Sequence, residues 1–324
     1  MTAPVLSVDE VRVTIGGHPV VDGVSFDVRE GEILSLVGES GCGKSMTAFA
    51  VIGLLPRAAT FAGGRVMLGD IDMGRLAESE RRRLRGNHLA MIFQEPVASL
   101  NPLMTIGRQI EESLIVHRKA GGRNVRSAAI AMLEEVGIPE PEIRYGQFPF
   151  ELSGGMCQRA MIAMALICRP RLLIADEPTT ALDVTIQAQI LDLMKRLRSE
   201  TGTAILLITH DMGVVADMAD RVAVMYAGRV IEEAGVEAIF ARQEHPYTRL
   251  LLSTIPRLDG RPKSILPSIE GVVPDIGQWP TGCRFNPRCP LSDAHCVEAQ
   301  PPLAPRSDVG RAACWHSDRV EAML

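Results

Sequence analysis

Hydrophobic and polar positions change their spacing several times along the chain, and each change marks an expected element. Residues 11–37 alternate short β-favouring runs with glycine-containing turns at residues 16–17, 22–23 and 30–31. This pattern predicts antiparallel strands that lead into a further strand at residues 33–37. Residues 45–53 have a helical pattern, and residues 63–71 are predicted to form one more hairpin.

A long middle segment, residues 103–167, has apolar positions three and four residues apart, which is the spacing of amphipathic helices. The clearest examples are Ile106, Ile110, Leu114, Ala129, Met132, Leu133 and Val136. Two almost uninterrupted apolar runs follow at residues 171–177 and 203–210, with a helical pattern at residues 186–197 between them. The order strand, helix, strand predicts a buried parallel sheet. The expected fold is therefore α/β, with a helical insert at about residues 97–165.

Composition changes after residue 252, where prolines and cysteines accumulate and aliphatic runs disappear. We expect a boundary near residues 253–262. A large domain at residues 1–255 would then be followed by a small Cys/Pro-rich extension at residues 256–324.

The bulk properties fit a folded protein and narrow its partners. The 324 residues are 46% hydrophobic and 23% charged, and the net charge of −5 argues against nucleic acid as the main partner. No run reaches the ~18 consecutive apolar residues that a membrane span needs, and the N-terminus lacks the pattern of a secretion signal. We therefore expect a cytoplasmic location, in which the seven cysteines are reduced thiols or metal ligands.

A glycine-rich loop directly after residues 33–37 matches G-x-x-x-x-G-K-[ST], the phosphate-binding loop. Backbone N–H groups of such a loop turn toward a triphosphate, while Lys44 reaches the β- and γ-phosphates and Ser45 offers its hydroxyl to Mg²⁺. The residues expected to bind the nucleotide here are Gly38, Ser40, Gly41, Gly43, Lys44, Ser45 and Met46. By itself the loop indicates only a nucleotide.

Three polar residues at the ends of apolar runs are candidates for the chemistry of ATP hydrolysis. Asp176 and Glu177 end the run at residues 171–177, so Asp176 is placed to hold Mg²⁺ and Glu177 to act as the general base. Two acids in such a position can also simply end a strand in a solvated loop. Gln94 ends another apolar run and is a candidate contact for Mg²⁺ or the attacking water.

Residues 152–159 read Leu-Ser-Gly-Gly-Met-Cys-Gln-Arg, about 110 positions after the phosphate-binding loop. Ser153, Gly154 and Gly155 offer a second anion cradle at the start of a helical pattern. With these motifs in this order, the chain resembles an ATP-binding cassette (ABC) ATPase over about residues 5–250. The resemblance implies a P-loop NTPase core with an antiparallel β subdomain, and it identifies Asp183 with the D-loop aspartate and His210 with the histidine that contacts the γ-phosphate.

The resemblance also implies a head-to-tail pair of ATPase domains. Ser153, Gly154 and Gly155 of one chain would close on the ATP that Lys44 of the other chain holds. ATP binding would close the pair, and hydrolysis would reopen it, because ATP contacts both faces only in the closed state.

Three positions depart from the pattern of this family. Ile15 stands where relatives usually stack an aromatic side chain on adenine, and Cys157 stands where relatives of this subfamily often carry arginine. Cys42 lies inside the phosphate-binding loop. Both cysteines are interpreted as tolerated small residues, although a thiol near a helix N-terminus can also have a lowered pKa and react.

Four cysteines after residue 282 have the spacing C-x5-C-x6-C-x17-C. They are Cys283, Cys289, Cys296 and Cys314. The C-x2-C pairs of zinc ribbons are absent, and four thiolates in a small unit can ligate a 4Fe-4S cluster, so the spacing leaves open a cluster, a zinc ion and unliganded thiols. Together with His245 and Pro246, this tail resembles the C-terminal extension of the dipeptide/oligopeptide importer ATPases. Some of these carry a 4Fe-4S cluster on these cysteines, so the resemblance favours the cluster.

The resemblance thus implies an ATP-hydrolysing, energy-coupling subunit of a bacterial dipeptide or oligopeptide importer. Such a subunit lies on the cytoplasmic side of the inner membrane, beneath two transmembrane permease subunits that an extracytoplasmic peptide-binding protein supplies. A second ABC ATPase subunit is expected, in a heterodimer rather than a homodimer. Gln94 and residues 97–105 are expected to form the groove that accepts a short permease helix.

Other functions were weighed against peptide import. His245 and Pro246 also occur in related nickel and glutathione importers, so these cargoes are alternatives. A non-transport ABC ATPase of ribosomes or chromosomes is disfavoured, because such relatives usually fuse two cassettes or insert long coiled coils. A redox sensor whose ATPase answers to the tail cluster is compatible with transport.

Overall fold

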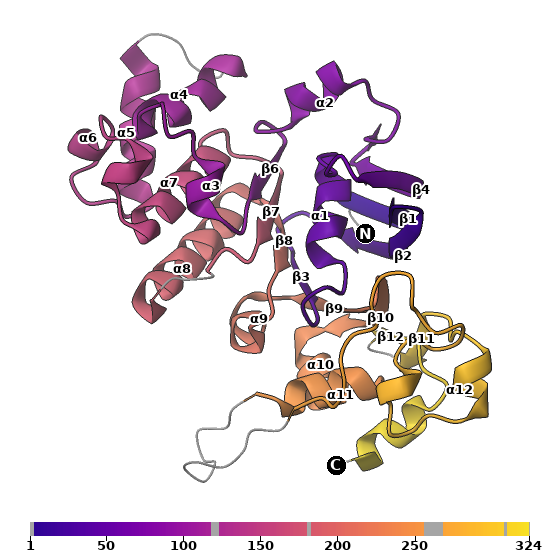
Figure 1. The fold of residues 1–324 in the computed structure, drawn as a ribbon. Helices are drawn as coiled ribbons and strands as arrows, with labels where there is room; N and C mark the ends of the chain where they lie inside the picture. The colour runs from indigo at the N-terminus through magenta and orange to yellow at the C-terminus, as the bar shows by residue number, and fades with distance from the viewer. Residues whose placement is uncertain (1–2, 118–122, 180–182, 256–267, 308–309, 324) are drawn as a thin grey trace. The chain divides into compact units, whose positions relative to one another are not determined.

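Residues 3–117, 123–179, 183–255, 268–307 and 310–323 are described in the computed structural model (Figure 1). Two units divide the chain. The helical unit comprises residues 1–6, 28–32 and 67–208, and the phosphate-loop unit comprises residues 7–27, 33–66 and 209–324. The boundary predicted near residues 253–262 falls largely on residues 256–267, which lie outside the described residues.

Five strands of the phosphate-loop unit lie in the order β11-β12-β10-β9-β3. Their bounds are β3 Ile33–Val37, β9 Arg221–Tyr226, β10 Arg229–Gly235, β11 Ala304–Ser307 and β12 Gly310–Ala312. β3 pairs with β9 in parallel, whereas the β9/β10, β10/β12 and β11/β12 pairs are antiparallel. β3 is buried along its whole length, as its nearly continuous apolar sequence predicts.

A second sheet contains β1 (Leu6–Ile15), β2 (His18–Val28) and β4 (Ala59–Leu68). Only Gly16 and Gly17, both with positive φ, join β1 to β2, and such a short connection makes neighbouring strands antiparallel. The end of β4 pairs antiparallel with β5 (Ile71–Asp72). The predicted antiparallel strands and the predicted hairpin at residues 63–71 are both confirmed. The turn predicted at residues 22–23 is wrong, because these residues lie inside β2.

The helices of the phosphate-loop unit are short. They are α1 Lys44–Ile52, α9 Met212–Met218, α10 Val236–Ala241, α11 Pro246–Ser253 and α12 Ala294–Glu298, with 3₁₀ turns η2 Asn286–Arg288 and η3 Ser317–Met323. The helix predicted at residues 45–53 is α1, which begins at the motif lysine and ends before Gly53, a left-handed cap.

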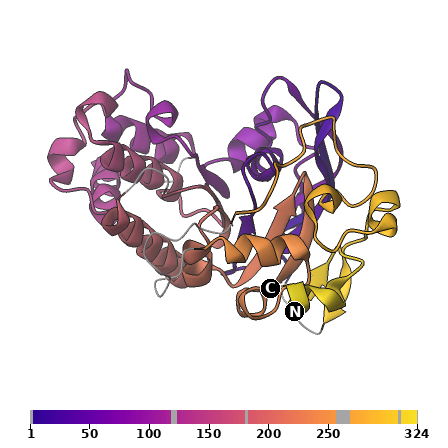
Figure 2. The ribbon, with the colours of Figure 1, turned by 60° about the horizontal axis from the view of Figure 1, so that its bottom comes forward.

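The tail is joined to the rest of the phosphate-loop unit by pairing and by packing. β12 pairs with β10, with Glu232 opposite Ala312, so the tail extends the sheet (Figures 1 and 2). Phe285 and Cys296 belong to the same buried hydrophobic cluster as Tyr226 of β9. The sequence predicted neither tail strand, because runs of four and three residues are too short to show a period of two.

The helical unit contains three parallel strands in the order β8-β7-β6. They are β6 Leu89–Ile92, β7 Leu172–Asp176 and β8 Ala204–Ile208, and all their residues are buried. The helices are α2 Glu78–Leu84, α3 Pro96–Ser99, α4 Ile106–Val116, α5 Arg123–Glu135, α6 Pro141–Arg144, α7 Gly154–Leu166 and α8 Val184–Thr201, with a 3₁₀ turn η1 Pro149–Glu151. The predicted strand, helix, strand order is confirmed.

Helices α3 to α7 form the segment that the sequence predicted as an insert, and Figure 1 shows them gathered together. All seven apolar positions that defined the predicted helical period are buried. In the described ranges no helix is both long enough and apolar enough to cross a bilayer.

Candidate functional site

The phosphate-binding loop connects β3 to α1 and needs glycine at several positions. Gly38, Gly41 and Gly43 have φ of 148°, 80° and 102°. A Cβ on Gly38 would lie 2.2 Å from the carbonyl oxygen of Met225, and one on Gly43 would lie 2.8 Å from that of Val20. Close approach of backbone therefore excludes any larger residue at Gly38 and Gly43.

Lys44 is the first residue of α1, and its side chain folds back over the loop. Its Nζ donates hydrogen bonds to the carbonyl oxygens of Gly38, at 2.7 Å, and of Glu39, at 3.0 Å, and the residue is 7% exposed. Ser45 and Met46 follow in the first turn of α1, at the positive end of the helix dipole. The loop thus presents an ammonium group and a helix N-terminus at one place, which suits an anion.

The acidic pair lies where β7 ends. Asp176 is 2% exposed, and Glu177 adopts a left-handed backbone with φ of 48°, which is unfavourable for a residue other than glycine. The N–H of Glu177 donates to the carbonyl of Ile208 at 2.8 Å, and Nε2 of Gln94 donates to Oε2 of Glu177 at 3.2 Å. The structure therefore brings together Gln94 and Glu177, which the sequence predicted as two separate site residues.

Two further predicted site residues cap helices of the helical unit. Ser153 is the N-cap of α7, and its Oγ accepts the N–H of Met156 at 3.3 Å. Ser153 and Gly154 are exposed, and Gly155 follows in the first turn. Asp183 is the N-cap of α8, while the rest of its predicted loop, residues 180–182, lies outside the described residues.

His210 belongs to the phosphate-loop unit and follows the end of β8 in the chain. His210 is exposed. The next residue, Asp211, caps α9 by accepting hydrogen bonds from the N–H groups of Gly213 and Val214. The histidine thus stands between a strand end and a helix start.

The four tail cysteines line one small cavity, together with His245, Phe285 and Trp315 among others. Burial raises the pKa of all four thiols. Together with the charges of neighbouring cysteines, it brings the pKa to about 12 for Cys289 and about 11 for Cys314. Burial also lowers the pKa of His245 to about 3, so this imidazole is neutral. The four thiols and the His245 imidazole are therefore uncharged at neutral pH.

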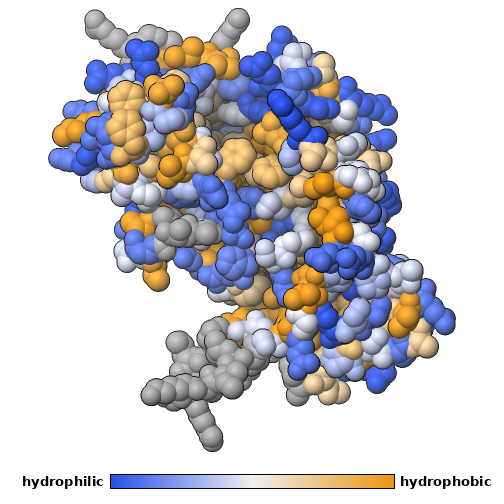
Figure 3. Space-filling view, in the orientation of Figure 1, coloured by the Kyte–Doolittle hydropathy of each residue, from blue (hydrophilic) through white to orange (hydrophobic). Residues whose placement is uncertain are grey.

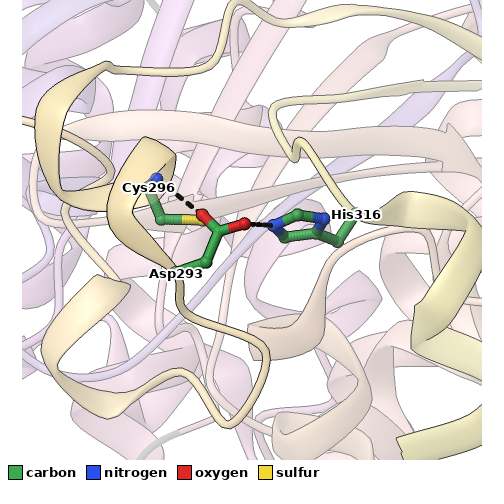
Figure 4. A group of neighbouring side chains, drawn as sticks. All are labelled: Asp293, Cys296 and His316. Atoms are coloured by element: carbon green, nitrogen blue, oxygen red, sulfur yellow. Dashed lines mark hydrogen bonds and ion pairs between the residues drawn. The ribbon is translucent and has the colours of Figure 1, made fainter.

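A second group of possible metal ligands lies beside this cavity (Figure 4). Asp293 accepts the N–H of Cys296 at 3.0 Å, and its other oxygen lies 3.0 Å from Nε2 of His316. The ligand atoms of these three residues lie within 4.8 Å of one another. Sequence reasoning had assigned no role to His316, since its partner Asp293 is far from it in the chain.

Comparison with known proteins decides the family. A sequence profile described as ABC transporter matches residues 21–180, and one described as oligopeptide/dipeptide transporter, C-terminal region, matches residues 231–296. The chain is 51% identical over 300 residues to the probable peptide ABC transporter ATP-binding protein y4tR of Sinorhizobium fredii, which covers 92% of this chain and 89% of that protein. This chain belongs to the family of ABC transporter ATP-binding proteins.

Two further relatives support this ABC assignment. The dipeptide transport ATP-binding protein DppD of Bacillus subtilis is 48% identical over 320 residues, covering 97% of this chain and 95% of that protein. The ATP-binding cassette MJ0796, solved as a dimer in a post-hydrolysis state bound to ADP and Pi, is 28% identical with a TM-score of 0.65. That match covers 71% of this chain and 98% of MJ0796, and it confirms the predicted α/β fold of an ABC ATPase.

The structure accounts for two of the three departures from the ABC pattern. Cys42 and Cys157 are buried, and burial raises the pKa of both thiols. Neither is therefore the activated thiol that a helix N-terminus can produce, and both fit as small buried residues. Ile15 ends β1 and is partly exposed, so it presents an aliphatic surface where relatives have an aromatic ring.

Two buried polar residues lie on α7, the signature helix, which begins at the Leu-Ser-Gly-Gly motif, and the sequence did not predict them as part of the site. Gln158 is 1% exposed and donates from Nε2 to the carbonyl of Pro178 at 2.6 Å, directly beside Glu177. Arg159 donates to the carbonyls of Val136 and Gly137 at 2.8 and 2.9 Å, and also to Gln189. The sequence feature that could have revealed them is a pair of polar residues within an otherwise mostly apolar helix.

Proposed function

We propose that this chain hydrolyses ATP to drive the import of dipeptides or oligopeptides through a membrane permease. The observation that carries this proposal is the presence, in one chain, of the ABC motifs and of a tail that matches the C-terminal region of oligopeptide/dipeptide transporters. Relatives that align over nearly the whole chain are named for peptide or dipeptide transport, which favours peptides over nickel or glutathione.

The residues of the ATP site are assigned by their chemistry. Backbone N–H groups from Gly38 to Met46, including those of Ser40, Gly41, Gly43 and Ser45, would hold the phosphates, with Lys44 neutralising their charge. The hydroxyl of Ser45, the carboxylate of Asp176 and the amide oxygen of Gln94 are hard oxygen donors of the kind that Mg²⁺ prefers, so the donor set fits this ion. Bound Mg²⁺ would stabilise charge on the phosphate oxygens.

Glu177 is proposed as the general base, with Gln94 as its positioning partner. Glu177 would accept a proton from the water that attacks the γ-phosphorus while the bond to the β-phosphate oxygen breaks. The hydrogen bond of 3.2 Å from Gln94 and the backbone tie to Ile208 support a fixed carboxylate at this position. His210 is proposed to contact the γ-phosphate, and Asp183 to lie at the dimer contact.

The signature residues are proposed to act on the ATP of a partner ATPase. Ser153 and Gly154 are exposed, and nothing lies within 4 Å of a Cβ built on Gly154, so this surface is open to an incoming phosphate. The dimeric state of MJ0796 supports a head-to-tail pair. In this chain the partner is proposed to be a second, different ABC ATPase, in a heterodimer.

The helical unit supplies the proposed contact with the two permease subunits. Leu103 is 86% exposed, Phe150 75% and Val97 60%, and these large hydrophobic side chains all belong to the helical unit. Figure 3 shows hydrophobic side chains at the surface of this unit. Residues 97–105 with Gln94 would form the groove for a cytoplasmic permease helix, which would hold the chain peripherally at the cytoplasmic side of the inner membrane.

Residues 1–255 are proposed to form the nucleotide-binding domain, with its insert at about residues 97–165, and residues 256–324 the extension with a 4Fe-4S cluster on its four cysteines. The four cysteines line one small cavity, which supports a ligand shared between them. Four thiolates are the usual ligand set of a 4Fe-4S cluster. Such a cluster would exchange single electrons.

The cluster is tested by purifying the full chain without oxygen and measuring iron, acid-labile sulfide and zinc. We expect about four iron atoms per chain, lost in the Cys289→Ser variant. Cys168→Ser is the matched control, because Cys168 is buried but lies outside the tail, and it should keep the iron. Stoichiometric zinc without iron would contradict the assignment.

The transport function is tested by affinity purification of this chain from its native membranes in mild detergent, with mass spectrometry of the proteins that accompany it. We expect two multi-spanning permeases, a second ABC ATPase and a peptide-binding protein. Ribosomal or chromosomal proteins without permeases would overturn the proposal.

A further inference from the structure

An arginine of the cysteine-rich tail holds a residue of the phosphate-binding loop. Nη1 of Arg288 lies 2.7 Å from Oε2 of Glu39, and Nη2 lies 3.0 Å from Oε1, so the guanidinium and the carboxylate meet through two parallel hydrogen bonds. The side chain of Arg288 is only 4% exposed and that of Glu39 28%. Two-pronged, partly buried pairs of this kind are among the stronger interactions between side chains.

Glu39 is held from three sides at once. Its carboxylate accepts from Arg288, its backbone N–H donates to the hydroxyl of Tyr247 at 2.8 Å, and its carbonyl oxygen accepts from Nζ of Lys44. Glu39 therefore lies between the tail and the lysine that the sequence assigns to the phosphates. A shift of Glu39 would change the position of Lys44 and of the loop N–H groups.

Arg288 is itself fixed by the folding of the cysteine loop, residues 283–289. It directly precedes Cys289, and its Nε donates to the carbonyl of Glu270 at 2.8 Å. Phe285, from the same loop, packs against Tyr226 and Tyr247, with ring centroids 5.2 and 5.4 Å apart. The arginine is thus carried on a buried aromatic cluster, so its side chain loses little further freedom when it binds Glu39.

A second contact joins the same two regions. Arg284 of the cysteine loop donates to the carbonyl of Ala227 at 2.5 Å, and the next N–H, that of Gly228, donates to the carbonyl of Cys42 at 2.9 Å. Cys42 lies inside the phosphate-binding loop. Residues 227 and 228 therefore connect Arg284 indirectly to the phosphate-binding loop.

We infer that Arg288 is a positioning residue for nucleotide binding: through Glu39 it holds the phosphate-binding loop in its ATP-binding shape, so that ATP affinity depends on the cysteine-rich tail. The inference rests on the proposed assignment of this loop to ATP. The tail would then affect nucleotide binding indirectly, because Arg288 contacts the loop and not the phosphates.

The test compares ATP binding and hydrolysis in full-length variants. Arg288→Ala should weaken binding of the nonhydrolysable analogue AMP-PNP with Mg²⁺ by about tenfold, the scale of one charge-assisted hydrogen bond, and raise KM for ATP similarly. The effect on kcat should stay within about twofold, because Arg288 does not touch the reacting atoms. Arg288→Lys keeps the charge but not the paired geometry, so it should restore affinity only in part.

Arg311→Ala is the matched control. Arg311 also belongs to the tail, but it pairs with Glu233 of β10, at 2.5 Å, whereas Arg288 pairs with Glu39 of the phosphate-binding loop. Its removal should leave AMP-PNP affinity unchanged. The charge swap Glu39→Arg with Arg288→Glu should bind more tightly than either single variant, and thermal unfolding should show that each variant is folded.

Three outcomes would overturn the inference. The first is that Arg288→Ala binds AMP-PNP as tightly as the native chain. The second is that Arg288→Ala and Arg311→Ala lose affinity equally. The third is that the charge-swap variant is folded but binds AMP-PNP no more tightly than the single variants. Because binding of AMP-PNP needs no permease, these results are independent of whether the chain serves peptide import. If neither the native chain nor any variant binds AMP-PNP, the proposed ATPase function itself is wrong.

Discussion

At the scale of single residues, the most informative position is Glu177. A left-handed backbone at a residue other than glycine costs free energy and persists only where neighbouring contacts impose it. Here the N–H bond to Ile208 and the side-chain bond from Gln94 impose it. Strain of this kind concentrates at functional sites, and the position coincides with the base that the sequence predicted.

Replacing Glu177 by glutamine should keep nucleotide binding but remove turnover. The amide keeps the shape and the contact with Gln94, but it cannot take a proton from water, so kcat should fall about a hundredfold or more. ATP hydrolysis and AMP-PNP binding of the variant check this, with Glu142→Gln on the exposed face of α6 as the control. Near-native kcat would rule out Glu177 as the base.

A second residue-scale prediction concerns Glu232 on β10. Burial raises the pKa of this carboxyl to about 7, whereas its ordinary value is 4.5. The folded chain therefore holds the proton more tightly than the unfolded chain does. The stabilising contribution of this group is present at low pH and is lost as the pH rises from about 4.5 to about 7.

Urea unfolding at pH 5 and pH 8 measures this contribution. Between pH 5 and pH 8, the native chain should lose roughly 2–3 kcal/mol more of its free energy of unfolding than the Glu232→Gln variant loses. The hydrogen bonds that glutamine cannot reproduce add a constant offset, so only the change with pH is diagnostic. Glu237→Gln, on the exposed face of α10, is the control and should show no such change with pH. The same difference between Glu232→Gln and the native chain at pH 5 and pH 8 would show that the pKa of Glu232 is not raised.

At the scale of elements, helix α7 connects the exposed Ser153 to the acidic loop of the helical unit. Its N-terminus presents Ser153 at the surface, while Gln158 one turn further on is tied to Pro178, next to Glu177. A rigid helix between these two contacts fixes the distance from the signature to the acidic loop. This arrangement would let contact with a partner's ATP and the position of the base influence each other.

Replacing Gln158 by alanine should leave the buried carbonyl of Pro178 without its donor. A lost buried hydrogen bond of this kind costs about 1–3 kcal/mol, so the midpoint of thermal unfolding should fall by several degrees. Turnover at a temperature where the variant is folded should fall as well, because the loop that carries Glu177 loses its support. The partly exposed Gln147→Ala serves as control; equal effects in both variants would show that α7 has no special role.

The sequence predicted the cassette elements well and the tail poorly, for physical reasons. β3, β7 and β8 are buried on both faces, so their apolar runs are unmistakable, and the burial of Ile110 and Leu133 follows from their helical period. β11 and β12 owe their existence to pairing with β10, a long-range contact that no local pattern encodes.

The candidate site divides in the same way. Motif residues such as Lys44 and Glu177 were recognisable because phosphate chemistry demands specific residue types at fixed spacing. The contacts of Arg288 with Glu39, and of Gln158 with Pro178, join residues 249 and 20 positions apart. Such pairs depend on the folded backbone, and an arginine or a glutamine alone carries no signal of its partner.

At the scale of the whole molecule, the tail shares strands, core and ion pairs with the phosphate-loop unit. β12 extends the sheet at β10, Phe285 fills the core beside Tyr226, and Arg288 reaches the phosphate-binding loop. The proposed division of labour gives nucleotide chemistry to residues 1–255, while the extension supports the loop that binds the phosphates.

The most direct measurement of the central claim is ATP hydrolysis by this chain assembled with its permeases and second ATPase in lipid vesicles. Peptide-loaded binding protein should stimulate hydrolysis and peptide uptake together, and Glu177→Gln in this chain should reduce both. A rate of ATP hydrolysis that does not change when the peptide-loaded binding protein is added, together with no peptide uptake, would contradict the account.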